Sequence, residues 1–143
     1  MNIIYDDVKK DLPCEQIQRL FVSAGWSDGS YTSFMDKPFI NSTLVISAWE
    51  NENLVGAVRV LSDQLCRSVI YDLVVLPEYQ NKGIGKELVR RCIEHFPNSE
   101  WLVGTTKERS GFYEKVGFQK DDHSDGVYLS IPSKLFSMIK QKE

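Results

Sequence analysis

The sequence has few of the residues from which metal sites and disulfide frameworks are built. Its 143 residues include only three cysteines (Cys14, Cys66 and Cys92) and two histidines (His95 and His123). An odd number of cysteines without a CxxC pair is typical of free thiols in a reducing compartment. The two histidines are far apart and lack the spacing of a zinc site or of a Cys–His nucleophilic pair. We therefore expect no metal.

Long apolar runs and clusters of basic residues are also missing. No apolar run approaches the roughly 18 residues that a membrane span needs, and residues 1–7 do not have the pattern of a signal peptide. The net charge is −3, and no group of Lys and Arg residues offers a stripe that could follow phosphates. We expect a cytoplasmic protein that binds neither membranes nor nucleic acid.

The length and composition fit one globular domain that covers residues 1–143. Apolar residues make up 42% and charged residues 26%, which is ordinary for a globular protein. A chain of this length buries a substantial core. Residues 132–143 follow the last expected strand and are predicted to be a C-terminal helix or a tail.

Helical and strand patterns alternate along the chain. Apolar and turn residues predict strands over 3–5, 43–49, 54–61, 69–75, 101–104 and 127–131, with another strand starting at Phe118. Helices are expected over 13–25, 31–40, 84–96 and 110–117. Residues 50–53 are expected to form a four-residue hairpin loop. This order predicts an α/β (α+β) protein with a mixed sheet and helices on both faces.

The most informative stretch is the glycine-containing segment 80–86, Gln-Asn-Lys-Gly-Ile-Gly-Lys. It follows the apolar strand 69–75 and opens an amphipathic helix whose apolar side contains Ile84, Leu88 and Cys92. A strand, a glycine loop and a helix in this order place several backbone N–H groups at a positive helix end. Such an end binds phosphate or pyrophosphate.

The spacing within this loop distinguishes between phosphate ligands. A dinucleotide fingerprint needs a third glycine where Leu88 stands, and a Walker loop needs a glycine at Gln80 and Ser or Thr at Glu87. The remaining pattern, Gln-x-x-Gly-x-Gly, resembles the acetyl-coenzyme A loop of the GCN5-related N-acetyltransferase (GNAT) family.

A second motif has the same resemblance. Residues 112–118, Phe-Tyr-Glu-Lys-Val-Gly-Phe, are similar to the last helix and turn of GNAT enzymes. The resemblance covers most of the chain, although only the two motifs are specific, and it is that of a small single-domain member of bacterial type. It implies a mostly antiparallel central sheet. It also implies transfer of an acetyl group from acetyl-coenzyme A to a primary amine, by direct attack in a ternary complex.

The resemblance also implies which residues contact the cofactor. Gly83 and Gly85 would let the backbone approach the pyrophosphate, and backbone groups of the strand would pair with the pantetheine. Tyr113 matches the family tyrosine that protonates or hydrogen-bonds the departing thiolate; a packed aromatic residue is the alternative. For the lysines, a solvated helix surface is an equal alternative. The expected cofactor contacts are Leu73, Val74, Val75, Gln80, Asn81, Lys82, Gly83, Ile84, Gly85 and Lys86.

The acceptor site and the general base are less defined by the sequence. Trp26, Tyr31 and Phe34 offer aromatic surface to an acceptor. Negative charge at the same mouth would suit a cationic, amine-bearing acceptor; it would come from Asp28, Asp121, Asp122 and Asp125. The base is left open between Asp72, a carboxylate within an apolar strand, and ordered water.

Two other functional classes are kept open. A non-catalytic acetyl-coenzyme A sensor would share the loop, but it would not need Tyr113. A nucleotide-binding oxidoreductase is disfavoured by the missing third glycine. We expect a small-molecule or peptide amine as partner, and a monomer or homodimer.

Overall fold

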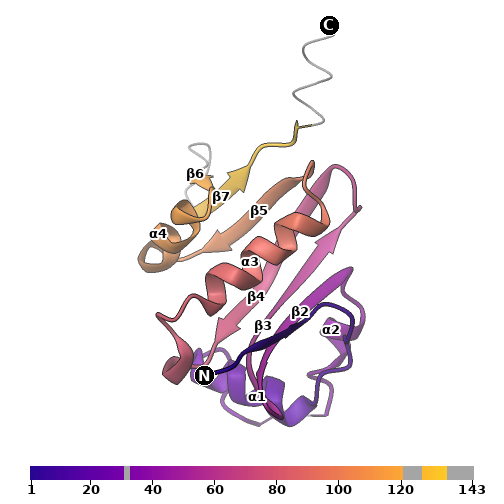
Figure 1. The fold of residues 1–143 in the computed structure, drawn as a ribbon, viewed down its shortest axis with the longest axis vertical. Coiled ribbons are helices and arrows are strands. Elements are labelled where there is room, and N and C mark those ends of the chain that lie inside the picture. The colour runs from indigo at the N-terminus through magenta and orange to yellow at the C-terminus, as the bar shows by residue number, and fades with distance from the viewer. Residues whose placement is uncertain (31–32, 121–126, 135–143) are drawn as a thin grey trace, which may run out of the picture.

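The computed structural model describes residues 1–30, 33–120 and 127–134. Within them, one seven-stranded sheet runs in the order β1-β2-β3-β4-β5-β7-β6 (Figure 1). Its strands are β1 (Ile4–Asp6), β2 (Leu44–Glu50), β3 (Asn53–Ser62), β4 (Arg67–Val75), β5 (Glu100–Thr105), β6 (Gln119–Lys120) and β7 (Val127–Ile131).

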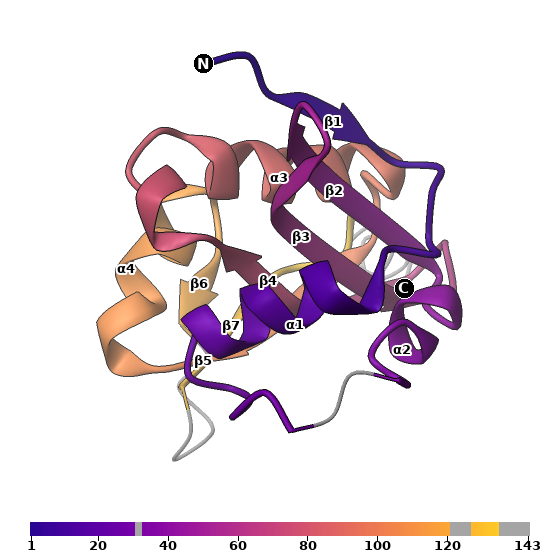
Figure 2. The ribbon, with the colours of Figure 1, turned by 90° about the horizontal axis from the view of Figure 1, so that it is seen from below.

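The sheet is mixed and mostly antiparallel, as predicted. Among the described strands, only β4 and β5 pair in parallel, and all other neighbouring strands are antiparallel. Helix α1 (Cys14–Ser23) lies on one face and α3 (Ile84–His95) on the other (Figure 2), so the prediction of helices on both faces is confirmed. Helix α4 (Lys107–Lys115) packs beside β6 and β7.

The core lies between the sheet and the two long helices. Ile17 and Leu20 of α1 are fully buried, as are Leu88 and Val89 of α3, because both helices have apolar residues at helical spacing. Residues 44–48 of β2 are buried on both sides, as predicted for an internal strand. No helix in the described part of the chain is long and apolar enough to span a membrane.

Three element boundaries were predicted wrongly. The second helix, α2, covers only Lys37–Ile40, because Pro38 does not fit the interior of a longer helix; Tyr31 lies outside the described residues. The hairpin loop has two residues instead of four, with Asn51 in the left-handed region at φ 54°. Helix α4 begins at Lys107, before the predicted start at 110, and its exposed charged first turn gives little apolar signal. The predicted C-terminal helix or tail covers residues 132–143, of which 135–143 lie outside the described residues.

Strand β4 contains a bulge that changes the course of the sheet. Arg59 pairs with Tyr71 and Ala57 with Val74, so one residue of β3 lies opposite two residues of β4. Asp72, one of these two, has φ 54°, and its carboxylate accepts a 2.6 Å hydrogen bond from Arg59 Nε. The parallel ladder with β5 covers only 67–70 of β4, although β4 continues to Val75. The sheet therefore opens between β4 and β5 beyond the bulge.

Candidate active site

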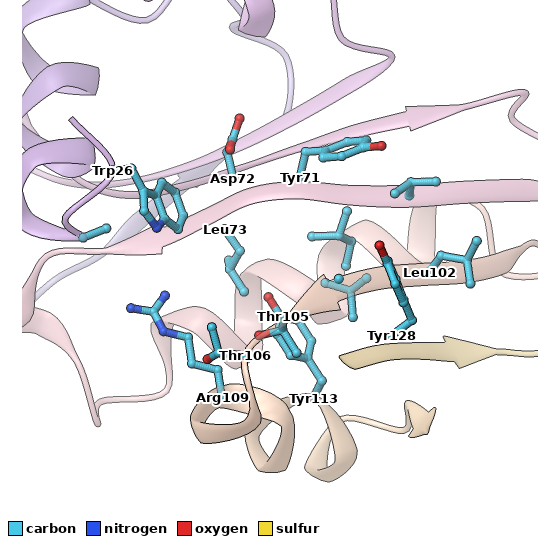
Figure 3. Close-up of a pocket in the computed structure, with 15 residues that line it drawn as sticks. Trp26, Tyr71, Asp72, Leu73, Leu102, Thr105, Thr106, Arg109, Tyr113 and Tyr128 are labelled. Carbon is cyan, nitrogen blue, oxygen red and sulfur yellow. The ribbon is translucent and has the colours of Figure 1, made fainter. Parts of the chain in front are cut away.

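The opening between β4 and β5 forms a cleft with two adjoining parts. The larger cavity, of about 750 Å³, lies between the splayed strands, and the smaller, of about 540 Å³, lies against the glycine loop. Leu73 of β4 and the α4 residues Arg109 and Tyr113 line both cavities. Figure 3 shows these three side chains in the larger cavity. The two cavities are therefore adjacent, one at the start of α3 and the other at the gap in the sheet, and these residues form their common wall.

The glycine loop presents backbone donors to this cleft. Gly83 caps α3 with φ 84°, and the first intrahelical bond runs from the Glu87 N–H to the Gly83 carbonyl, over 3.0 Å. The N–H groups of 84–86 precede that bond and have no partner within the helix. Because residues 83–86 line the smaller cavity, these donors and the positive end of α3 can accommodate an anionic group there.

The two glycines are required for different reasons. A Cβ at Gly83 would meet no atom within 4 Å, so the positive φ explains this glycine. A Cβ at Gly85 would lie 3.3 Å from Cζ of Phe112, so Gly85 lets α4 pack against the loop. Close packing against Phe112 therefore explains a glycine at position 85, in addition to the expected approach of the pyrophosphate.

The polar side chains of the loop mainly hold its shape. Gln80 Nε2 donates a 2.9 Å hydrogen bond to the Val75 carbonyl and closes the turn after β4. The Lys82 ammonium lies 5.7 Å from the centre of the Tyr79 ring. Asn81, at φ 62°, and Lys86 line the smaller cavity, as do Gln80 and the strand residues Leu73, Val74 and Val75.

The negative charge nearest the loop is neutralised. Glu87, in the first turn of α3, accepts hydrogen bonds from Arg90 and Arg91 at 2.6 to 2.8 Å. The hydrogen bond from Arg90, together with that from Arg91, lowers the pKa of the Glu87 carboxyl to about 2. Glu87 therefore stays ionised and paired, and it adds little net repulsion to an anion at the helix start.

Tyr113 lies where the two parts of the cleft meet. Its ring packs edge-on against Phe112 and Phe118, with ring centres 5.0 and 5.6 Å apart. The residue is only 7% exposed, and this burial raises the pKa of the Tyr113 phenol to about 12, against a smaller opposing effect of Arg109. The hydroxyl keeps its proton at neutral pH and can donate a hydrogen bond.

The expected acceptor residues are only partly brought together. Trp26 lines the larger cavity, whereas Phe34 is 52% exposed and lines neither cavity. Asp28 is also away from the lining, and its carboxylate accepts a hydrogen bond from the Ser30 N–H. Asp121, Asp122 and Asp125 lie outside the described residues, as does Tyr31.

Asp72 reaches the cleft but is already engaged. It lines the larger cavity, yet its carboxylate forms the 2.6 Å ion pair with Arg59. Because the guanidinium already occupies this carboxylate, the contact gives no support to Asp72 as the proton acceptor.

Several lining residues were missed by the sequence reasoning. Arg109, Tyr71 and Tyr128 all line the larger cavity. Arg109 precedes Tyr113 by four residues, which places both on one helix face, and this spacing was a signal available in the sequence. The two tyrosines gave no such signal, because their positions depend on strand pairing, of Tyr71 with Arg59 and of Tyr128 with Gly104.

Comparison with known proteins agrees with this geometry. The family model described as "Acetyltransferase (GNAT) domain" matches residues 10–127. An uncharacterized N-acetyltransferase, ycf52, from Pyropia yezoensis is 30% identical over 131 residues, which are 87% of this chain and 74% of that protein.

Solved structures share the fold. A GNAT family acetyltransferase from Streptococcus pneumoniae TIGR4 superimposes with a TM-score of 0.71 at 24% identity, over 83% of this chain and 89% of that one. The PaiA N-acetyltransferase of Thermoplasma acidophilum, determined in complex with coenzyme A, has a TM-score of 0.69 at 18% identity, over 93% and 99%. Because the family model matches most of the chain and a relative is 30% identical to it, the chain belongs to the GNAT family of N-acetyltransferases.

Proposed function

We propose that this enzyme transfers the acetyl group of acetyl-coenzyme A to a primary amine by direct attack in a ternary complex. The observation that carries the proposal is the pair of adjoining cavities, one at the start of α3 and one in the gap between β4 and β5, with Tyr113 lining both. Its loop end suits a pyrophosphate and its strand end has space for a second substrate.

The cofactor would lie along the smaller cavity. The pyrophosphate would accept hydrogen bonds from the N–H groups of 84–86, and Lys86 would add positive charge. The pantetheine would follow β4 past Leu73, Val74 and Val75, because the ladder to β5 ends at Ile70 and no other described strand pairs with that edge. Gln80 and Lys82 would support the loop rather than bind phosphate.

The reaction would form a C–N bond and break a C–S bond. The neutral amine attacks the thioester carbonyl carbon, the coenzyme A thiolate leaves, and the amine proton passes to water. The Tyr113 phenol, with a pKa of about 12, is a weaker acid than an ordinary thiol, whose pKa is about 8.5. Tyr113 would therefore stabilise the thiolate by donating a hydrogen bond, since complete proton transfer would be uphill by roughly 5 kcal/mol.

Direct attack is supported by the residues around the cleft. Among the described residues that line the two cavities, none is a cysteine or a histidine. Cys92 is buried in the core, and burial raises the pKa of its thiol to about 12, so it stays protonated and unreactive. The cleft therefore offers no thiolate to carry the acetyl group between the substrates.

Other features of the function are proposed on more general grounds. Free Cys14, Cys66 and Cys92 suit a cytoplasmic location, because thiols stay reduced there. We also propose that residues 1–143 form one catalytic domain, active as a monomer or homodimer without a metal.

The test is thiol release from acetyl-coenzyme A in the presence of amines, amino acids, polyamines, aminoglycosides and peptides. We expect one class to release thiol in proportion to acetylated product, identified by mass spectrometry. Initial rates should intersect when both substrates are varied, and protein incubated with acetyl-coenzyme A alone should keep its mass. Tight binding of acetyl-coenzyme A without turnover for any amine would instead establish the sensor alternative.

A further inference from the structure

Arg109 differs from the other arginines in having a side chain directed into the cleft. It lines both cavities, and its guanidinium points across the mouth toward Trp26 (Figure 3). The Trp26 backbone N–H donates a 2.9 Å hydrogen bond to the Phe21 carbonyl, and the Trp26 ring packs edge-on against the Phe21 ring. These contacts hold Trp26 in place. The two side chains therefore bound the entrance to the space beside Tyr113.

The guanidinium of Arg109 has no acceptor among the residues that the structure describes. The chain contains five other arginines, and each has a carboxylate, amide or carbonyl partner: Arg19, Arg59, Arg67, Arg90 and Arg91. An arginine in a cleft without a protein partner is available to a ligand, and its planar fork matches a carboxylate in a bidentate geometry.

The charge of the cleft also favours an anionic ligand. Asp72 is the only carboxylate among the described residues that line the two cavities, and it is paired with Arg59 at 2.6 Å. Arg109 thus supplies an uncompensated positive charge. This arrangement differs from the cationic acceptor expected from the acidic residues, since Asp28 lies away from the cleft.

We propose that Arg109 binds a carboxylate of the acceptor, so that the substrate is an amino acid or another amine with a carboxylate a few bonds from its nitrogen. The inference rests on the proposed acetyl transfer at Tyr113. Arg109 and Tyr113 are four residues apart on α4, which puts their Cβ atoms about 5–6 Å apart on one face. A carboxylate held by Arg109 would therefore place a nearby amine at the thioester beside Tyr113.

The test compares acceptors that differ only in the carboxylate. Amino acids, their amides and the corresponding decarboxylated amines are assayed with wild type, Arg109→Gln, Arg109→Lys and the control Lys107→Gln. The control removes the same charge from an exposed residue in the same helical turn, outside both cavities. Rates are divided by the concentration of the unprotonated amine, because the amine pKa differs between the acceptors.

We expect the wild type to prefer the amino acid, and Arg109→Gln to raise its KM by about 10- to 100-fold, the effect of losing a charge-assisted hydrogen bond. The amide should be unaffected, Arg109→Lys should restore part of the loss, and Lys107→Gln should behave as wild type. The dissociation constant of acetyl-coenzyme A, measured by calorimetry, should stay the same in every variant.

Different outcomes separate this inference from the proposed function. An equal loss for acid and amide, or weaker acetyl-coenzyme A binding in Arg109→Gln, would overturn it and assign Arg109 to the cofactor. Turnover of amides but not of amino acids would refute the role of Arg109 and leave acetyl transfer intact. If no amine turned over, calorimetry with N-acetyl amino acids and their amides would still decide: selective binding of the acids through Arg109 supports the inference, and its absence overturns it.

Discussion

The role of the glycine loop can be tested at Gly83 with a pair of substitutions that differ only in charge. Gly83 has φ 84°, and a Cβ built there meets no atom within 4 Å. Asn and Asp are the residues other than glycine that best tolerate this left-handed region. Gly83→Asn and Gly83→Asp should therefore fold alike, with a small and equal loss of stability from the backbone.

The two variants should differ in their affinity for acetyl-coenzyme A. For the repulsion between a carboxylate at position 83 and a pyrophosphate on the first turn of α3, we take a separation of about 5 Å, the spacing of neighbouring side chains on one helix face. At an effective dielectric constant of about 20, two unit charges at that distance repel by about 3 kcal/mol. The Asp variant should therefore bind roughly 100-fold more weakly than the Asn variant, since 1.4 kcal/mol corresponds to a factor of ten.

Calorimetric titration with acetyl-coenzyme A measures this difference, and thermal unfolding of the free variants verifies that they are equally stable. The gap between the two dissociation constants should narrow with added salt, because the Debye length falls from about 10 Å at 0.1 M to about 3 Å at 1 M. Equal affinities in two folded variants would refute the placement of the pyrophosphate at this loop.

The other single substitutions address the thiolate donor, the bulge and the helix start. Tyr113→Phe removes only the hydroxyl, so kcat should fall by roughly 10- to 1,000-fold while acetyl-coenzyme A binding changes little; full activity would make Tyr113 a packing residue. Asp72→Asn should lower the free energy of unfolding by about 1 kcal/mol through loss of the Arg59 ion pair. Asp72→Ala should lower the free energy of unfolding by about 1 kcal/mol more than Asp72→Asn, because alanine also disfavours the positive φ. Equal urea midpoints for the two variants would refute this difference. Glu87→Gln should lower the free energy of unfolding by about 1 kcal/mol at pH 7; the value is small because the arginine partners are partly exposed to solvent. Because the pKa of Glu87 is lowered to about 2, its contribution is present above the ordinary carboxyl pKa and fades as the pH falls toward 2. Urea unfolding of wild type and variant should converge at that pH.

The local parts of this site could be predicted from the sequence because their signals are local. Residues 80–86 combine a strand end, two glycines and the start of an amphipathic helix within one short segment, and the structure forms α3 at Ile84 as predicted. Tyr113 likewise falls on a helix that ends before Gly117, whose φ of 107° only glycine adopts readily.

The features that join distant segments could not be predicted in the same way. The contact of Gly85 with Phe112 and the approach of Arg109 to the mouth beside Trp26 depend on how α4 and α1 are placed by the sheet. The bulge at Asp72 depends on its register with β3, and an Asp in an apolar strand gives no local sign of it. The helix predicted over 31–40 is shortened to α2 because Pro38 does not fit the interior of a longer helix.

The bulge leads to a last prediction, because it lets one edge of β4 stay paired while the other is open. Beyond Asp72, Val74 and Val75 still pair with Ala57 and Gly56 of β3, so within the described part of the chain only the edge toward β5 lacks a strand. The N–H and C=O groups on this edge need no strand partner, because they face a cleft that is open to water or to a ligand. If the bulge opens this edge, its removal should close it.

Deletion of Asp72 tests this directly. Tyr71 and Val74 keep their partners Arg59 and Ala57, and the residue between them then faces Val58 in a regular ladder. The deletion is made together with Arg59→Gln, so that no arginine loses its carboxylate, and Arg59→Gln alone is the matched control. We expect the deletion variant to fold and to extend the parallel ladder to the end of β5 at Thr105, so that the Leu73 amide becomes protected from hydrogen exchange. It should bind acetyl-coenzyme A at least 10-fold more weakly than the control. Unchanged affinity in a folded deletion variant would show that the opening between β4 and β5 has a cause other than the bulge.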